Sequence, residues 1–308
     1  MDDDQWRLTG KADALRLRAE MIRAIRRFFL DQDFLEVETP IRIPAPAPEF
    51  HIDAVASGEW FLQTSPELCM KRLLAAGYPK IFQICRCFRA GERGIRHLPE
   101  FTLLEWYRTG TDYRTLMDDC EILIARVAVD MGLGGAIAWQ GRKIDLAPPW
   151  ERLTIREAFA RYASLTVEEA LRREMFDETM VCEIEPHLGR ERPVFLYEYP
   201  ASLGALARVK AEDPEVAERF ELYIAGLELA NAFSELTDAA EQRRRFEEAS
   251  RDRRRNNCPV TPMPERFLAA LSRMPRSAGI ALGVDRLAMI FTDRSEIDAV
   301  VAFPPELL

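Results

Sequence analysis

Positively charged side chains cluster between two apolar segments in the first third of the chain. Residues 80–88 and 101–107 are rich in aromatic and β-branched types, so we expect two strands there. The segment between them carries several arginines, Arg89 and Arg96 among them. Because a guanidinium keeps its charge and matches phosphate oxygens, a hairpin mouth with these side chains suits a polyphosphate. A solvated, charged hairpin tip would explain the same residues.

Acidic residues cluster in the last third of the chain. Glu221 and Glu228 flank the expected junction between a strand and a loop, and Glu235 follows them. Two carboxylates at such a junction can converge on a hard cation such as Mg²⁺, which prefers oxygen ligands. Acidic clusters are also common as solvated faces, and the chain has 51 acidic residues. Both interpretations stay open from the spacing alone.

Residues 64–67 form a third candidate segment, which contains Ser65, Pro66 and Glu67. A proline and an acidic residue are typical of the first turn of a helix. The missing N–H of proline is not needed there, and the acid meets the positive end of the helix dipole. A simple helix start would therefore account for the segment without any ligand.

In this order, the segments resemble the class II aminoacyl-tRNA synthetases of the lysyl, aspartyl and asparaginyl type. Residues 88–107 resemble motif 2 of that class, residues 279–287 resemble motif 3, and residues 11–40 resemble the more degenerate motif 1. The resemblance implies an α+β fold, the class II catalytic domain, in which a mainly antiparallel sheet is flanked by helices. Motif 1 lies at a dimer interface in that class, so a homodimer is implied as well. We expect a single domain over residues 1–308.

The resemblance implies an ATP site built around two arginines. Arg89 is expected to contact the α-phosphate, where charge develops when a carboxylate attacks and pyrophosphate leaves. Arg286 is expected to stack on adenine and to meet the γ-phosphate, with Phe101 on the opposite face of the ring. Both arginines would be catalytic through positioning and electrostatics, since no covalent nucleophile is implied. The implied ATP-binding residues are Arg89, Glu92, His97, Phe101, Glu228, Leu229, Gly283 and Arg286.

The segment around the acidic cluster closely resembles the part of lysyl-tRNA synthetases that holds Mg·ATP and the lysine side chain. By that resemblance Glu221 and Glu228 hold magnesium, and Glu235 pairs with the substrate ε-ammonium. Tyr107 would complete that site with a phenolic hydrogen bond, and Glu67 would receive a second ammonium group. Acids at both ends of a pocket suit a lysine-like substrate with two amines. The implied substrate-binding residues are Ser65, Pro66, Glu67, Tyr107, Asn231, Glu235 and Ala281.

Departures from lysyl-tRNA synthetases narrow the family. The resemblance to motif 1 begins near the N-terminus, which leaves no room for an anticodon-binding OB-fold barrel. Residues 15–303 instead resemble the elongation factor P–(R)-β-lysine ligases, which pass a lysyl group from an adenylate to a lysine of elongation factor P. Ala281 fits that group, since lysyl-tRNA synthetases tend to have glycine there. Residues 90–91 and Leu98 depart from the usual motif 2, so adenine would be recognised through backbone groups and Glu92.

The resemblance therefore implies an ATP-dependent ligase that uses Mg²⁺. It would adenylate (R)-β-lysine or lysine, and an ε-amine of elongation factor P would then attack the acyl carbon; no tRNA anticodon binding is expected. One alternative is a ligase that prefers α-lysine or another acceptor. Another is a non-catalytic synthetase paralogue with a regulatory role. The residues of the implied Mg·ATP site are all present, which disfavours this last alternative because a binder needs no complete catalytic site.

Composition excludes several other classes of protein. The net charge of −9 argues against a general nucleic-acid binder, and a hydrophobic content of 48% is ordinary for a chain that buries a core. The acidic N-terminus is no signal peptide, and no apolar run approaches the roughly 20 residues of a membrane helix. The six cysteines form no regular framework, and we expect Cys85 and Cys87 to point to opposite faces of a strand, which disfavours a shared metal. We predict a cytoplasmic protein with reduced thiols and no membrane contact.

Hydrophobic periodicity predicts the remaining elements. Thr154 begins a capping box with Glu157, and residues 167–187 are mostly helical. Residues 297–303 should form a strand or a buried segment. Helices are also expected over 11–33, 112–131, 238–255 and 264–274, and strands over 60–63, 193–199, 205–210 and 219–225.

Overall fold

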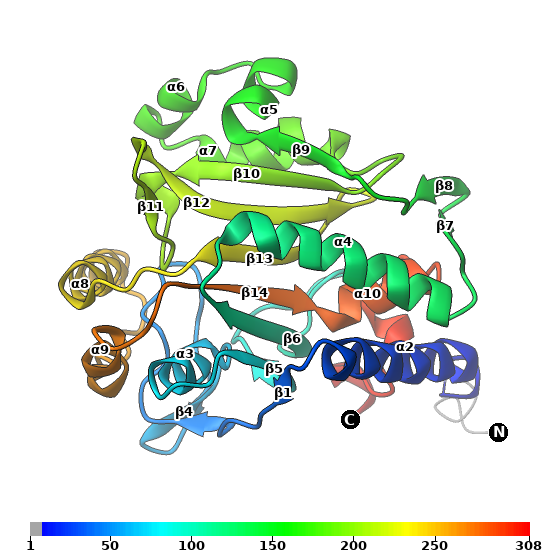
Figure 1. The fold of residues 1–308 in the computed structure, drawn as a ribbon, viewed down its shortest axis with the longest axis horizontal. Helices are drawn as coiled ribbons and strands as arrows, with labels where there is room; N and C mark the ends of the chain where they lie inside the picture. The colour runs from blue at the N-terminus through cyan, green and yellow to red at the C-terminus, as the bar shows by residue number, and fades with distance from the viewer. Residues whose placement is uncertain (1–7) are drawn as a thin grey trace.

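A mixed sheet forms the centre of the computed structural model, which describes residues 8–308 (Figure 1). The acidic N-terminus that we interpreted from the sequence, residues 1–4, lies outside this range. The outermost pairs of strands are parallel and all other neighbours in the sheet are antiparallel. In spatial order the strands are β1 (Leu35–Glu36), β5 (Lys80–Phe88), β6 (Glu100–Thr109), β14 (Ser277–Gly283), β13 (Leu227–Ser234), β12 (Asp213–Ile224), β10 (Val194–Pro200) and β9 (Glu151–Thr154), with β11 (Val209–Lys210) beside β12.

The inner strands place apolar side chains on one face of the sheet. Leu104 of β6 is in register with Leu282 of β14, and Trp106 with Ile280. All four are buried, and residues paired across antiparallel strands share a face. Because side chains alternate along a strand, the residues between them must point to the opposite face. That second face carries the candidate site.

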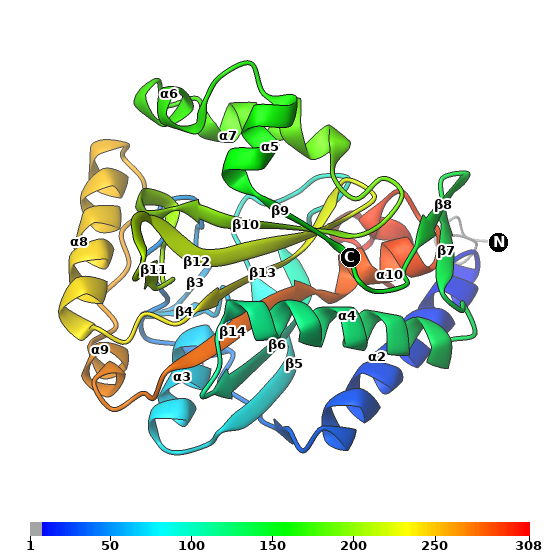
Figure 2. The ribbon, with the colours of Figure 1, turned by 45° about the horizontal axis from the view of Figure 1, so that its top comes forward.

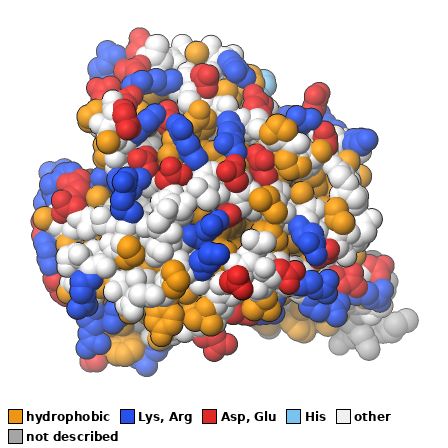
Figure 3. All heavy atoms as spheres, viewed as in Figure 1, with side chains coloured by type: hydrophobic (Ala, Val, Ile, Leu, Met, Phe, Trp, Pro, Cys, Tyr) orange, Lys and Arg blue, Asp and Glu red, His pale blue; other side chains and the backbone are white. Residues whose placement is uncertain are grey.

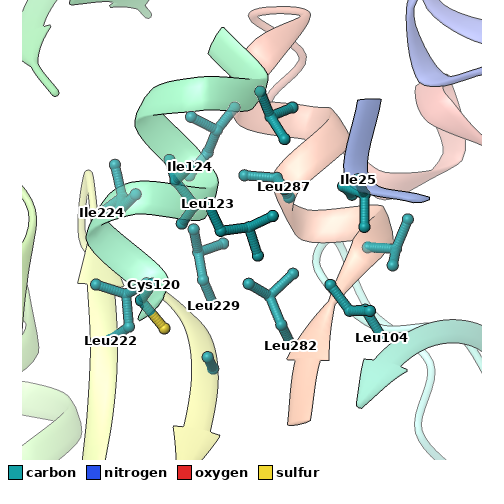
Figure 4. Packing of buried hydrophobic residues seen from close by; sticks show 14 of the residues in the cluster. Ile25, Leu104, Cys120, Leu123, Ile124, Leu222, Ile224, Leu229, Leu282 and Leu287 are labelled. Carbon is teal, nitrogen blue, oxygen red and sulfur yellow. The ribbon is translucent and has the colours of Figure 1, made fainter. Parts of the chain in front are cut away.

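Within the described residues, three helices cover the apolar face. They are α2 (Ala12–Asp31), α4 (Tyr113–Asp130) and α10 (Val284–Phe291). Figure 4 shows Ile25 of α2, Leu123 of α4 and Leu287 of α10 pointing toward Leu104 and Leu282 of the sheet. The fully buried side chains in this layer form the main hydrophobic core, and burying each such residue contributes roughly 1.5–3 kcal/mol.

The remaining helices form two smaller clusters at the ends of the sheet. One cluster joins α3 (Glu67–Ala75), α8 (Ala239–Arg255) and α9 (Glu265–Leu271) beside β6. The other joins α5 (Ile155–Tyr162), α6 (Val167–Arg172) and α7 (Phe176–Thr179), which lie over β9 and β10 in both views (Figures 1 and 2). The short elements are β2 (Arg42–Ile43), β3 (Ala56–Ser57), β4 (Trp60–Leu62), β7 (Ala136–Trp139), β8 (Arg142–Asp145), a π-helix at Met180–Ile184, and 3₁₀ helices at Glu185–His187, Ala201–Leu203, Ile297–Val300 and Pro305–Leu307.

Side-chain caps fix where several helices begin. Thr154 and Thr166 each form a complete capping box, and Asp112 and Asp238 each accept two backbone N–H groups. These four residues therefore start α5, α6, α4 and α8 at defined positions. None of the helices in residues 8–308 is long and apolar enough to cross a membrane.

Most of the predicted elements are confirmed, and the fold is α+β, with a largely antiparallel sheet flanked by helices as expected. Strands β2, β3, β7, β8, β9, β13 and β14 were not predicted, and the segment of β13 was expected to be a loop. The β7–β8 hairpin turns at Gln140 and Gly141, both at positive φ, and a Gln-Gly pair is a weak turn signal. The predicted strand 205–210 is reduced to β11, and 297–303 contains a buried 3₁₀ helix rather than a strand.

The expectation for Cys85 and Cys87 is wrong. Residues two apart on a strand point to the same face, and the two sulfur atoms lie 3.9 Å apart on β5. The described part of the chain has no disulfide and no group of three or more His, Cys, Asp or Glu side chains that could hold a metal ion. The close pair of thiols therefore does not form part of such a metal site.

A buried ion pair joins two of the helices that cover the core. Arg18 of α2 contacts Asp285 of α10 and donates a hydrogen bond of 2.9 Å to Thr102 Oγ1. The backbone N–H of Thr102 on β6 donates to Asp285 Oδ2 at 2.7 Å. Asp285 is 2% exposed, so removing its carboxylate would leave the Arg18 guanidinium without its charged partner in a nearly dry site.

We predict that Asp285→Ala lowers the free energy of unfolding by about 3 kcal/mol, measured by urea denaturation, because breaking one side of a buried pair is costly. Asp13→Ala is the matched control. Its carboxylate pairs with Arg16 on the same helix α2, but the Asp13 side chain is 84% exposed, so no measurable change is expected. Equal effects of the two substitutions would contradict the role of the buried pair.

Candidate functional site

Polar side chains on neighbouring strands form a row across the second face of the sheet. Glu105 of β6 is in register with Ala281 of β14, Ala281 with Asn231 of β13, and Asn231 with Glu221 of β12. Each of these residues lies one position away from an apolar residue that faces the core. The alternation that builds the core therefore also brings Glu105, Asn231 and Glu221 onto one surface.

A second row lies two residues further along the same strands. It contains Tyr107, Gly279, Phe233 and Arg219, again in register. The absence of a side chain at Gly279 matters here, because a Cβ atom would lie 2.2 Å from the Tyr107 ring and 2.5 Å from Glu235 Oε1. Gly279 therefore makes room for two residues of the predicted ammonium site.

A β-bulge brings Glu228 to the same face. Register along β12 and β13 shifts between Leu222 and Tyr223, so that Tyr223 pairs with Glu228. The extra residue, Leu229, is 2% exposed and packs in the main core (Figure 4). Glu221 and Glu228 thus lie on adjacent strands and not at the strand-to-loop junction that we expected.

These rows line a cavity of about 1170 Å³. Its walls come from residues 48–52, from the loop after β5 and from α8. The cavity brings together most of the predicted site residues, which are Ser65, Glu67, Arg89, Glu92, His97, Phe101, Tyr107, Glu221, Glu228, Leu229, Asn231, Ala281, Gly283 and Arg286. Pro66 and Glu235 are the two predicted residues that do not line it.

A lysine of the protein itself lies between two of the predicted ammonium ligands. Lys71 of α3 is buried and contacts Glu67 Oε1 at 2.5 Å, and it also pairs with Glu235. Burial alone would lower the pKa of Lys71, but the charges of Glu235 and Glu67 outweigh this effect and raise the pKa above its usual value. The Lys71 side chain therefore stays an ammonium. Glu235 therefore lies beneath the cavity, with its charge engaged by Lys71.

Glu105 lines the cavity at this end together with Glu67. Ser65 Oγ donates to Glu105 Oε1 at 2.6 Å, and the Tyr107 hydroxyl donates to Glu105 Oε2 at 2.7 Å. Burial and the nearby charge of Glu67 raise the pKa of Glu105 to about 7. Burial likewise raises the pKa of Glu235 to about 8, against the opposing charge of Lys71. The pocket therefore holds more carboxyl groups than cations to neutralise them.

Arg219 connects the two predicted parts of the site. Its guanidinium donates to Asn231 Oδ1 at 3.2 Å and to Glu221 Oε1 at 2.6 Å, and it lies 4.4 Å from the centre of the Tyr199 ring. The Tyr223 hydroxyl donates to the other oxygen of Glu221 at 2.8 Å. Burial and the charge of Glu228 raise the pKa of Glu221, although the positive charge of Arg219 acts in the opposite direction.

The donor set of Glu221 and Glu228 fits Mg²⁺ in one respect. Mg²⁺ is commonly held by one or two carboxylates together with substrate phosphates, and these two carboxylates share a face beside the arginines of the phosphate end. Within residues 8–308 there is no third acidic or histidine ligand that would complete a protein cage. These residues could therefore hold the ion only together with a bound phosphate ligand.

Arg286 and Arg89 lie at the opposite end of the cavity. Arg286 donates to the carbonyl of Glu228 at 2.7 Å, and its guanidinium lies 2.6 Å from His97 Nε2. Burial, followed by the charge of Arg286, lowers the pKa of His97, so the neutral ring accepts this hydrogen bond. Arg89 lies 5.0 Å from the centre of the Phe101 ring. The stacking of adenine between Arg286 and Phe101 stays a prediction.

Sequence reasoning missed four residues that the structure adds to the site, Glu49, Lys71, Glu105 and Arg219. A local signal existed for three of them. Glu105 and Arg219 stand two positions before Tyr107 and Glu221 on their strands, and Lys71 stands one helical turn after Glu67. No comparable signal marks Glu49, which lies in an irregular loop.

Comparisons with known proteins agree with this geometry. Residues 5–306 match the family described as tRNA synthetases class II (D, K and N). Proteins named elongation factor P–(R)-β-lysine ligase from Hamiltonella defensa and Edwardsiella ictaluri are each 41% identical to the chain, over 98% of both sequences. The protein of that name from Salmonella paratyphi B is 39% identical over 97% of both. The chain therefore belongs to the class II tRNA synthetase family, and within it to the elongation factor P–(R)-β-lysine ligases.

Proposed function

We propose that this protein activates (R)-β-lysine with ATP as an aminoacyl-adenylate and transfers the acyl group to a lysine ε-amine of elongation factor P. The observation that carries the proposal is a cavity with carboxylates at one end and two arginines at the other. Carboxylates bind ammonium groups, and guanidinium groups bind phosphates. The names of the relatives support the same substrate and acceptor.

The acidic end of the cavity suits a substrate with two amines. Glu67 and Glu105 line it, and Glu235 adds a further negative charge beneath its floor. Lys71 supplies one positive charge, which leaves carboxylates for the two ammonium groups of the substrate. A monoamine would leave part of this buried negative charge uncompensated, which disfavours its binding.

Activation would proceed by attack of the substrate carboxylate on the α-phosphorus, with pyrophosphate as the leaving group. Arg89 would stabilise the charge that develops on the α-phosphoryl oxygens, and Arg286 would hold the terminal phosphate. Mg²⁺ held by Glu221, Glu228 and the phosphates would neutralise part of the phosphate charge. Catalysis would then depend on positioning and electrostatics.

ATP–pyrophosphate exchange with (R)-β-lysine, (S)-α-lysine or no amino acid tests this proposal. We expect exchange that depends on the amino acid, is fastest with (R)-β-lysine, stops with EDTA and returns with added Mg²⁺. Faster exchange with (S)-α-lysine would contradict the proposed substrate, and exchange that survives EDTA would contradict the metal. No exchange with any amino acid would contradict the activity.

We also propose a homodimer. Large hydrophobic side chains are exposed around the N-terminal elements, with 57% exposure at Leu30, 49% at Leu35 and 43% at Tyr78. Figure 3 shows hydrophobic side chains gathered on the lower edge of this face, over the region of α3 and β1. Exposed apolar patches of this kind commonly mark interfaces. Light scattering should give twice the mass of the 35.3 kDa chain, and a monomer would contradict the proposal.

A cytoplasmic location and the lack of tRNA binding stay predictions.

Glu105→Gln should weaken amino-acid activation about 100-fold in kcat/KM, because the buried carboxylate that would face a substrate ammonium loses its charge. ATP binding in the absence of amino acid should be unchanged. Glu100→Gln is the matched control, since Glu100 lies at the exposed start of the same strand β6. Activation equal to that of the control would remove Glu105 from the ammonium site.

The affinity for the diamine should rise with pH between 6 and 8. Glu105, which lines the cavity and has a pKa of about 7, is mostly protonated at pH 6 and must lose this proton to meet an ammonium. For each proton that binding releases, the dissociation constant falls roughly tenfold for every unit by which the pH rises, as long as the pH is below the pKa. Calorimetry in buffers of different ionisation enthalpy measures this release, which should fall by about one proton in Glu105→Gln. A dissociation constant independent of pH would contradict the assignment.

A further inference from the structure

The second step of the proposed reaction needs a base. The ε-amino group of a lysine has a pKa of about 10.4, so only about one in a few thousand is uncharged at pH 7. An ammonium group has no lone pair with which to attack the acyl carbon. A positioned proton acceptor near the acyl group would therefore raise the transfer rate.

Glu49 differs from the other acids around the cavity. Each of the other acidic residues that line it has an ion pair or hydrogen bond to another described residue. These partnered acids are Glu67, Glu92, Glu105, Asp177, Glu185, Glu221, Glu228, Glu241, Glu248, Asp252 and Asp285. Glu49 also lines the cavity, but its carboxylate has no hydrogen bond or ion pair to any residue in 8–308.

The loop that carries Glu49 is held firmly in place. Arg253 of α8 is 4% exposed and donates to the carbonyls of Glu49 at 3.0 Å, Phe50 at 2.9 Å and Ile52 at 3.1 Å. The same guanidinium pairs with Asp53. Glu49 is therefore fixed by its backbone, while its carboxylate stays free to take a proton.

Four charged groups act on Glu49, and they come from both ends of the cavity. Glu67 and Lys71 belong to the ammonium end, whereas Arg89 and Arg219 lie toward the phosphate end. The acyl carbon of an adenylate joins the amino-acid part to the phosphate, so it would lie between these ends. Glu49 is half-buried, and its loop neighbour Phe50 is 38% exposed, so the loop reaches the surface of the protein beside the cavity.

Burial and then the charge of Glu67 raise the pKa of Glu49 to about 7. The positive charges of Arg89, Arg219 and Lys71 act in the opposite direction but do not outweigh them. A carboxyl group with such a pKa is about half ionised at neutral pH. It accepts a proton more readily than an ordinary glutamate and still releases it to solvent afterwards.

We propose that Glu49 is the general base that takes a proton from the ε-ammonium of the acceptor lysine during transfer, an inference that rests on the proposed function. The freed amine attacks the acyl carbon of the adenylate. The bond between that carbon and the phosphate oxygen breaks, and AMP leaves with the electron pair. The attacking nitrogen loses its second proton to solvent as the amide forms, and Glu49 then returns its proton to solvent.

Glu49→Gln tests the assignment. ATP–pyrophosphate exchange with (R)-β-lysine should stay within about twofold of the unmodified protein, because adenylation does not need this base. Single-turnover transfer from the preformed adenylate to elongation factor P should fall about 100-fold. The transfer rate of the unmodified protein should rise with pH through an inflection near 7, which Glu49→Gln should lack. Glu49→Asp, which keeps a carboxylate, should recover part of the rate.

Two controls separate chemistry from structure. Glu59→Gln changes an exposed acid in the same part of the chain and should leave both steps unchanged. Hydroxylamine, which is already largely uncharged at pH 7, should capture the adenylate equally fast in the unmodified protein and in Glu49→Gln, because it needs no base.

Each other result would overturn the assignment. Unchanged transfer in Glu49→Gln, with normal exchange, would contradict the role of Glu49 alone. A raised KM for (R)-β-lysine in exchange with normal transfer would make Glu49 a substrate ligand instead. Equal loss of the hydroxylamine reaction would indicate a disturbed site, and no exchange in the unmodified protein would contradict the proposed function itself.

Discussion

The two-residue period of the central strands is the constraint on which both the core and the site depend. Leu104 and Leu282 face the helices, while their neighbours Glu105 and Ala281 face the cavity. A slip of one residue in the register would exchange these faces, burying a carboxylate among apolar side chains and exposing leucines. The energy of the hydrophobic core therefore enforces the geometry of the polar face. This explains how a broad sheet can hold reacting groups in place without a separate scaffold.

A surplus of buried negative charge shapes the chemistry of the acidic end. Among residues 8–308, Lys71 is the one cation that pairs with Glu67 and Glu235, and Glu105 is held by hydroxyl groups. Charges buried in this way are costly, so the carboxyl groups keep protons at a pH where ordinary glutamates lose them. A substrate that brings ammonium groups can replace those protons. The same desolvation that makes the empty arrangement costly thus favours a diamine over other amino acids.

The sequence allowed the motifs to be placed, and the fold class followed from their resemblance to a known family rather than from periodicity. Arg89, Arg286 and the acidic pair needed only the order of residues along the chain. Glu105 needed in addition the knowledge of which face of β6 is buried, and this depends on helices that pack from elsewhere. Glu49 could not be predicted because its position depends on Arg253, which lies far along the chain and holds the loop through three backbone carbonyls. Contacts between distant segments leave no local pattern.

Small residues on β14 give the acidic end its depth. Gly279 lacks the Cβ atom that would overlap the Tyr107 ring at 2.2 Å, so the tyrosine can reach Glu105 while Glu235 lies beneath it. Ala281, two residues further on, is in register with Glu105 and with Asn231, and its methyl group lies on the cavity floor between them. A methyl group there reduces the space available to a bound chain, and close-packed surfaces distinguish ligands by volumes of this size. Under the proposed function both isomers would carry the same charges to the same carboxylates, so the choice between an α-amine and a β-amine would depend on this one methyl group.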